Sequence, residues 1–282
     1  MLYILSAHFK NKEWIEIQLD YLSKYMKVPF RIWVSTWGIE RVEDERIDRV
    51  YKDVAKLHSE QVNKLAIEVL DVADSEDYIL FIDSDAFPIK EINELEKILN
   101  GNDLAAIQRI ENNGDPQPHP CFCLTRVDFW KNIEGDWGKG TKRWVGNDGI
   151  KRTDIGGLLY EKLNSLGIEW TKIRRSNSHS FHPLWFGVYG DLIYHHGAGS
   201  RLFFSASDYK NLPKWKFLLL KYGLARFDGV GMLDKILNFN LEKTLRDSDA
   251  RIKNLSRLII EDIKRDYSFW QKIENHIRES KQ

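Results

Sequence analysis

One short segment constrains the fold of this chain more than any other. Five consecutive residues of mainly apolar character, Tyr78 to Ile82, are followed at once by Asp83, Ser84 and Asp85. An apolar run without alternation is typical of a central strand that is covered on both faces of a sheet. The two carboxylates therefore follow the carboxyl end of a buried strand, which is where open α/β sheets bind their ligands.

The rest of the first half alternates short apolar runs with helical patterns, which predicts an α/β sheet with crossover helices. We expect strands at 2–5, 30–35, 78–82 and 104–110, and helices that carry apolar stripes at 14–25, 62–70 and 92–99. Beyond about residue 206 the pattern is helical and amphipathic to the end of the chain. The 282 residues therefore predict an α/β catalytic domain over 1–205 and a helical extension over 206–282.

Asp83 and Asp85 are one residue apart on an extended chain, so their side chains project to the same side. Two close carboxylates repel each other unless a cation lies between or beside them. A hard divalent ion meets that need and keeps coordination positions free for diphosphate oxygens. The pair therefore predicts a metal site at this edge of the sheet.

The segment Tyr78 to Ile89, YILFIDSDAFPI, resembles the DxD segment of glycosyltransferases with the GT-A fold. That fold is Rossmann-like, and in it the apolar strand and DxD follow a nucleotide-binding half built from βα units, as they do here. The resemblance implies transfer of a sugar from a nucleotide diphosphate, UDP favoured and GDP possible, to a hydroxyl of a glycan or lipid-linked glycan. Inverting and retaining chemistry both stay open.

The same resemblance implies ligands for the donor and its metal ion. Mn²⁺ or Mg²⁺ would bridge Asp85 to the diphosphate, with Asp83 nearer the ribose or donor sugar. Ser6 and His8, in the expected loop after the first strand, would hold base and ribose, and Asn63, at the start of the helix before the DxD strand, would touch the nucleotide. The alternative for these three is that of ordinary polar residues on the surface.

A second cluster, YHHGAGSR at 194–201, holds two histidines, two glycines and an arginine. Imidazole binds divalent ions, and glycine permits close approach of the backbone to a phosphate. Many GT-A enzymes supply a late histidine as a metal ligand, so the resemblance implies that role for His196 or His195, with His196 narrowly favoured because it adjoins the glycine turn. Arg201 would hold the diphosphate, since a guanidinium binds it bidentately.

Asp154 precedes an amphipathic pattern that Gly167 ends. In inverting GT-A enzymes an acidic residue at a helix start, some distance after DxD, removes the acceptor proton, and Asp154 resembles it in order and placement. The competing interpretation is a helix N-cap, a position that Asp fills well. Asp148 in the segment GNDG is the other candidate for the base.

Aromatic side chains give two further predictions of surfaces. Trp130, Trp137 and Trp144 offer flat faces on which acceptor sugars could stack, although a core role for each is the alternative. Residues 213–222, PKWKFLLLKY, are basic, aromatic and apolar, which would suit peripheral contact with a membrane that carries a lipid-linked acceptor. The alternative is a helix packed on the core with lysine stems at its rim.

Composition excludes several partners and locations. Lys plus Arg and Asp plus Glu are 42 each, so no global field attracts nucleic acid. Cys121 and Cys123, two apart on a predicted strand, should share one face and form neither a disulfide nor a zinc site. We see no signal peptide and no apolar stretch near 20 residues, which predicts a cytoplasmic protein, peripheral to the inner face of the membrane where 213–222 binds it.

Two other functions compete with a transferase. Haloacid-dehalogenase-like phosphatases also place DxD after an apolar strand, but on the first strand, and with Thr or Val four residues after the first Asp, where this chain has Phe87. A non-catalytic sugar- or nucleotide-binding module could keep the fold and the ligands without turnover. The presence of both clusters, at 83–85 and at 194–201, favours the transferase.

Overall fold

The computed structural model describes residues 1–178, 184–197 and 241–279. The chain divides into two compact units, the first comprising Met1–His179 with Pro183–Ser200, and the second Ser180–His182 with Arg201–Gln282. The described part of the second unit is helical and consists of α9 (Leu241–Arg265), the 3-10 helix η2 (Phe269–Gln271) and α10 (Ile273–Glu279). Among the described residues, no helix is long and apolar enough to cross a membrane.

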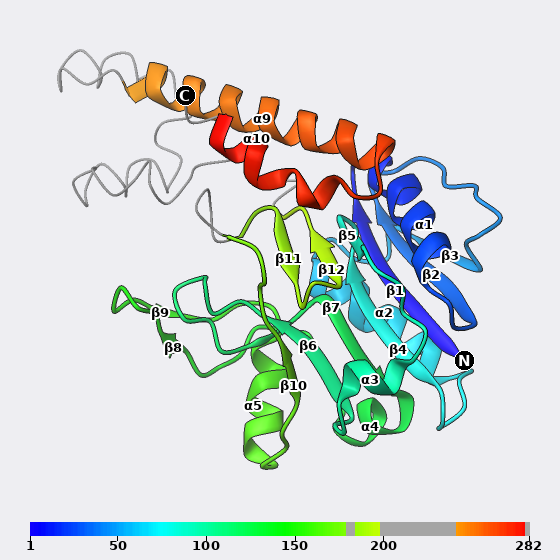
Figure 1. Ribbon diagram of the computed structural model, residues 1–282. Coiled ribbons are helices and arrows are strands. Elements are labelled where there is room, and N and C mark those ends of the chain that lie inside the picture. The colour runs from blue at the N-terminus through cyan, green and yellow to red at the C-terminus, as the bar shows by residue number, and fades with distance from the viewer. Residues whose placement is uncertain (179–183, 198–240, 280–282) are drawn as a thin grey trace. The chain divides into compact units, whose positions relative to one another are not determined.

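A seven-stranded, mostly parallel sheet organises the first unit, in the order β10-β6-β7-β4-β1-β2-β3 (Figure 1). Its strands are β1 (Leu2–Phe9), β2 (Phe30–Trp37), β3 (Arg49–Lys52), β4 (Tyr78–Asp83), β6 (Leu104–Gln108), β7 (Pro118–Arg126) and β10 (Thr171–Ile173). β7 runs antiparallel to both of its neighbours, whereas β1 pairs in parallel with β2 and β4. The predicted α/β class with a predominantly parallel sheet is confirmed.

Helices and small sheets complete the unit. The helices are α1 (Glu13–Tyr25), α2 (His58–Leu70), α3 (Leu95–Leu99), α4 (Val127–Asn132) and α5 (Gly157–Ser165). A three-stranded sheet in the order β11-β12-β5 is formed by β5 (Ala86–Pro88), β11 (Gly187–Tyr189) and β12 (Ile193–His195). A two-stranded hairpin joins β8 (Trp144–Val145) to β9 (Lys151–Arg152).

β4 is buried on both faces of the sheet, as its unbroken apolar run predicts. Leu80 and Ile82 belong to the core cluster that also receives Ile15, Leu19 and Leu22 of α1. Ile79 and Phe81 belong to the opposite cluster, which receives α2, α4 and α5. At about 25 cal/mol per Å² of apolar area removed from water, these two layers are the main source of the unit's stability.

The two cysteines differ from the expectation that they share a face. A register shift lies between Ala106 and Ile107 of β6, which pair with Cys123 and His119 of β7. The extra residues in β7 break the alternation of its side chains. Cys121 therefore lies in one core cluster and Cys123 in the other, and both are free thiols.

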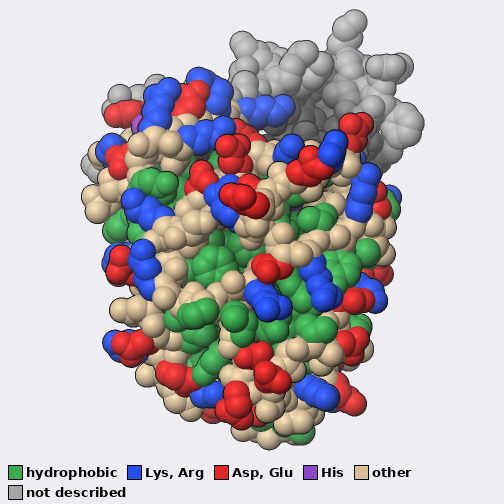
Figure 2. Space-filling view, turned by 90° about the vertical axis from the view of Figure 1, so that its right-hand side faces the viewer, with side chains coloured by type: hydrophobic (Ala, Val, Ile, Leu, Met, Phe, Trp, Pro, Cys, Tyr) green, Lys and Arg blue, Asp and Glu red, His purple; other side chains and the backbone are tan. Residues whose placement is uncertain are grey.

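The face drawn in Figure 2 shows how charge is distributed on one side of the molecule. Acidic and basic side chains alternate there around apolar ones, and neither sign forms a continuous patch among the described residues. This arrangement agrees with the equal totals of the two signs over the whole sequence.

Candidate functional site

Three potential metal ligands meet where β4 ends. Nε2 of His195 lies 3.4 Å from Oδ1 of Asp85 and 3.5 Å from Oδ2 of Asp83. One ligand atom from each residue lies within 4.8 Å of the other two. Two carboxylates and one imidazole are a donor set that Mn²⁺ and Mg²⁺ accept, so the residues fit such an ion.

The three-stranded sheet explains why His195, distant in sequence, reaches the carboxylates. β5 begins directly after Asp85, and β12 pairs with it antiparallel so that His195 lies opposite Ala86. The backbone N–H of His196 then donates to the carbonyl of Asp85 at 2.9 Å. The backbone pairing of β12 with β5 therefore fixes the position of the His195 imidazole beside the Asp85 carboxylate.

The turn between β4 and β5 is held by α1 and α2. Nε2 of Gln18 donates to the carbonyls of Asp83 and Ala86 at 2.7 and 2.8 Å, and the Gln18 side chain is buried. Nε2 of His58, at the first turn of α2, lies 3.1 Å from Oδ1 of Asp83. Gln18 thus fixes the backbone of the turn, and His58 orients the Asp83 carboxylate.

The charges of the three groups are strongly coupled. Burial opposes a proton on His195, but the neighbouring Asp85 carboxylate outweighs burial and raises the pKa of the imidazole well above its usual range. Burial would raise the pKa of Asp83, yet the imidazoles of His58 and His195 lower it overall. The two carboxylates thus keep a proton on His195, and a metal ion that binds there would replace that proton, because imidazole ligates in its neutral form.

His196 differs from the prediction that it is the favoured ligand. Its Nδ1 lies 2.9 Å from the hydroxyl of Tyr194, and its ring packs 4.8 Å from that of Trp14. Burial lowers its pKa to about 4. Because adjacent residues on a strand face opposite ways, the triad takes His195, and His196 belongs to the packing behind it.

Ser6 and His8 also differ from the prediction, because β1 continues through them to Phe9 instead of ending at Leu5. Both side chains are buried, and Oγ of Ser6 lies 3.1 Å from Nε2 of His8. Burial lowers the pKa of His8 to about 4. β1 lies between β2 and β4, so polar residues on it are covered like apolar ones.

Both polar atoms of the Asn63 side chain form hydrogen bonds within the fold. Its Nδ2 donates to Oδ1 of Asp136 at 2.7 Å, and its Oδ1 accepts from the backbone N–H of Trp137 at 3.0 Å. The amide thus clamps α2 to the segment after α4. We therefore leave Asn63 out of the proposed nucleotide site.

The two candidates for the base occupy different settings. Asp148 forms a two-pronged ion pair with Arg152 across the β8–β9 hairpin, which lowers its pKa to about 2. The Asp154 side chain is 39% exposed, and its Oδ2 lies 3.7 Å from Nη2 of Arg109. α5 begins only at Gly157 and makes no side-chain cap, so the N-cap interpretation of Asp154 is wrong.

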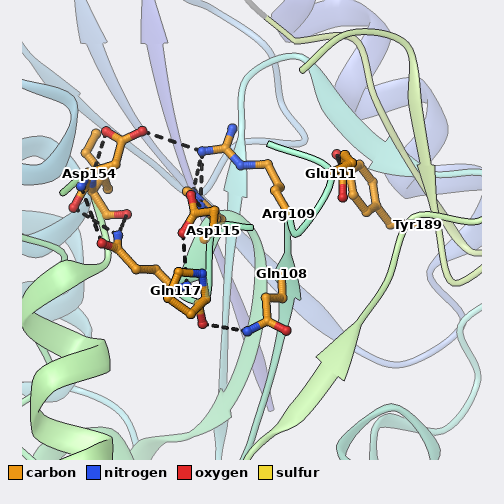
Figure 3. Close-up of polar contacts among 10 residues, drawn as sticks. Gln108, Arg109, Glu111, Asp115, Gln117, Asp154 and Tyr189 are labelled. Carbon is orange, nitrogen blue, oxygen red and sulfur yellow. Dashed lines mark hydrogen bonds and ion pairs between the residues drawn. The ribbon is translucent and has the colours of Figure 1, made fainter. Parts of the chain in front are cut away.

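A polar cluster surrounds Arg109, and among its residues only Asp154 was predicted from the sequence (Figure 3). It follows β6 and contains Arg109 and Glu111, with Asp115, His119 and Asp154 around them. Arg109 is also one of the cations that lower the pKa of Asp83, so the cluster lies within electrostatic reach of the triad. Its signal in the sequence was the place of Gln108 and Arg109 at the carboxyl end of a predicted strand.

The remaining predictions concern tryptophans and the tail. Trp130 and Trp137 are buried and stacked in the core, with ring centroids 5.5 Å apart, so neither offers a face to a sugar. Trp144 is half-buried. Arg201 and residues 213–222 lie outside the described residues.

No family model and no curated protein matches the sequence. Two solved structures of the glycosyltransferase GlyE from Streptococcus pneumoniae TIGR4 are similar to the chain in part. The apo form covers 61% of this chain and 44% of its own, with 13% identity and a TM-score of 0.37. The other covers 47% of this chain and 36% of its own, with 15% identity and a TM-score of 0.34. The chain thus spans less than half of either GlyE chain, and its function has to be inferred from the site.

Proposed function

We propose that the chain is a metal-dependent glycosyltransferase that moves a sugar from a nucleotide diphosphate to an acceptor hydroxyl. The observation that carries the proposal is the Asp83–Asp85–His195 triad at the carboxyl edge of a mostly parallel sheet. An ion held there would neutralise charge on the departing diphosphate as its bond to the sugar breaks. UDP-sugars are the favoured donors, with GDP-sugars next, and Mn²⁺ or Mg²⁺ is the proposed ion.

The protein's own residues have distinct parts in this scheme. Asp83, Asp85 and His195 hold the ion, and Gln18 fixes the turn that carries the two carboxylates. Asp154, the exposed carboxylate of the neighbouring cluster, receives the acceptor proton if the enzyme inverts. Asp148 is left out of the mechanism because its carboxylate forms an ion pair with Arg152.

The test is Mn²⁺-dependent release of nucleoside diphosphate from UDP- and GDP-sugars, with and without glycan-type acceptors. We expect Asp85→Asn to lower turnover by at least roughly a hundredfold, because the variant keeps the shape but loses the ligand charge. Asp148→Asn is the matched control and should keep wild-type turnover.

Three outcomes contradict the proposal in different ways. Full metal-dependent activity in Asp85→Asn would remove the triad from the mechanism. Binding of sugar nucleotides without any turnover, acceptors supplied, would favour a non-catalytic module. Release of phosphate from p-nitrophenyl phosphate, with no sugar transfer, would favour a phosphatase.

A further inference from the structure

Arg109 is a nearly buried cation with most of its hydrogen-bonding capacity unused. Its side chain is 13% exposed, and its contacts all go through Nη2, at 2.7 Å from Nδ1 and 3.1 Å from Nε2 of His119 and 3.7 Å from Oδ2 of Asp154. Within the described ranges, Nε is buried without a partner and Nη1 makes no hydrogen bond. A guanidinium carries five N–H donors, and leaving them unpaired in a buried place costs free energy.

Two buried residues hold Arg109 in this position. Asp115 is fully buried, and its Oδ2 lies 2.9 Å from Nε2 of His119. His119, itself 2% exposed, contacts the guanidinium through both ring nitrogens, most closely through Nδ1. The contacts from Asp115 through His119 to Arg109 therefore fix the cation at the edge of the site, where Nη1 is the donor left for a ligand.

Glu111 supplies the complementary acceptor. Its Oε1 accepts a hydrogen bond of 3.0 Å from the hydroxyl of Tyr189, while its Oε2 is buried and has no partner in the described part of the chain. Tyr189 belongs to β11, the strand paired with the one that carries His195. Figure 3 shows Arg109 between Asp154 on one side and Glu111 on the other.

The charges around Arg109 limit the class of ligand. Asp115 and Asp154 place two carboxylates near the guanidinium and Glu111 adds a third to the cluster, so an anionic ligand would meet net repulsion. A hydroxyl both donates and accepts, and so can bond to a carboxylate and a guanidinium together. A ring with several neighbouring hydroxyls meets the free donors and acceptors of this cluster.

We propose that Arg109, Glu111 and Asp154 form a subsite that binds the hydroxyls of a neutral sugar, and that excludes acidic sugars. The inference rests on the proposed function and adds the substrate class to it. The sugar comes either from the donor or from the acceptor, and the two sources share this chemistry. Asp115 and His119 are positioning residues for Arg109.

The test compares sugar nucleotides with the bare nucleotide by calorimetry in the presence of Mn²⁺. The probes are UDP and GDP, four neutral donors (UDP-glucose, UDP-galactose, UDP-N-acetylglucosamine and GDP-mannose) and the acidic UDP-glucuronate. We expect wild type to bind a neutral donor more tightly than the acidic one. Glu111→Gln and Arg109→Gln should lower the affinity for that neutral donor by roughly tenfold, while the affinity for the bare nucleotide stays within about twofold of wild type.

Arg126→Gln is the matched control, because Arg126 pairs with Glu96 and Asp103 near the start of β4, at the opposite end of that strand from the triad. Glu111→Gln is isosteric, and thermal unfolding identifies any variant that fails to fold. If donor binding is unchanged but KM for methyl glycosides or lactose as acceptors rises, the subsite binds the acceptor sugar and the proposal stands.

Two results would overturn the proposal separately from the function. Unchanged donor affinity in both variants, together with unchanged or absent use of the glycosides, would remove the subsite while leaving the transferase intact. Tighter binding of UDP-glucuronate than of neutral donors by wild type, lost in Glu111→Gln and Arg109→Gln, would also refute it, because the subsite would then accept an acidic sugar. A wild-type chain that binds no sugar nucleotide would overturn the proposed function, and the subsite with it.

Discussion

His8 is a titratable residue whose neutral form the fold requires. Its ordinary pKa of 6.5 falls to about 4 because burial disfavours the charged imidazole. Below pH 6.5 the unfolded chain binds a proton here that the folded chain does not bind until about pH 4. The contribution of His8 is thus complete above pH 6.5 and is lost as the pH falls toward 4, by about 3 kcal/mol in all.

The check is urea unfolding at pH 7.5, 6, 5 and 4.5 for wild type and His8→Gln. Other histidines titrate in both proteins, so the difference between the two free energies of unfolding isolates His8. We expect that difference to shrink as the pH falls, because only wild type loses the His8 contribution. A difference that is constant over this range would show that the His8 pKa is not shifted.

Single residues also show how far the sequence predicted the site. Asp83 and Asp85 were found because two carboxylates at the end of an apolar strand repel each other unless a cation or ligand lies beside them. The choice between His195 and His196 depends on the register of β12 against β5, a pairing that is not local in sequence. Arg109 looked ordinary, since its partners lie 10 and 45 residues away by numbering.

At the scale of elements, Gly197, which follows the end of β12, has a structural role. Gly197 has φ of 75°, and an added Cβ would lie 2.0 Å from the carbonyl oxygen of Leu184. The glycine that suggested close approach to a phosphate thus permits close approach to the protein's own backbone. It lets the chain turn directly after the two histidines.

Gly197→Ala should therefore destabilise the protein by about 2–4 kcal/mol, the sum of backbone strain and a steric clash. Gly101→Ala is the matched control, because Gly101 has φ of 81° but nothing within 4 Å of an added Cβ. It should cost only the strain, about 1–2 kcal/mol. Equal losses in thermal or urea unfolding would show that the approach to Leu184 is not tight.

Elements were predicted best where periodicity was strong and worst at their ends. β4 and α2 appeared where their apolar patterns placed them. β1 runs to Phe9 because it is paired with β2 on one side and with β4 on the other. This pairing keeps Ser6 and His8 in the strand, and the local sequence does not show it. The register shift in β7 has no local signal either, and it separates Cys121 from Cys123.

At the scale of the whole molecule, the α/β class followed from alternation along the chain, because crossover helices produce parallel neighbours. The three-stranded sheet did not follow, since its strands come from residues 86–88, 187–189 and 193–195. That sheet completes the triad. Distant pairing of short strands is therefore the step between the predicted fold and the assembled site.

All three proposed metal ligands belong to the first compact unit, so metal binding should stabilise that unit in particular. At a Mn²⁺ concentration 100 times the dissociation constant, binding adds about 2.7 kcal/mol to the stability of the state that binds. Amides of β1 and β4 that exchange only on unfolding should then exchange roughly a hundredfold more slowly. Amides of α9, in the second unit, should keep their rates.

Hydrogen exchange read by mass spectrometry, with Asp85→Asn as the control that gains no protection, measures the exchange rates in both units. Equal slowing in β4 and α9 would mean that the two units unfold together, whereas no slowing in either would mean that the triad does not hold the ion.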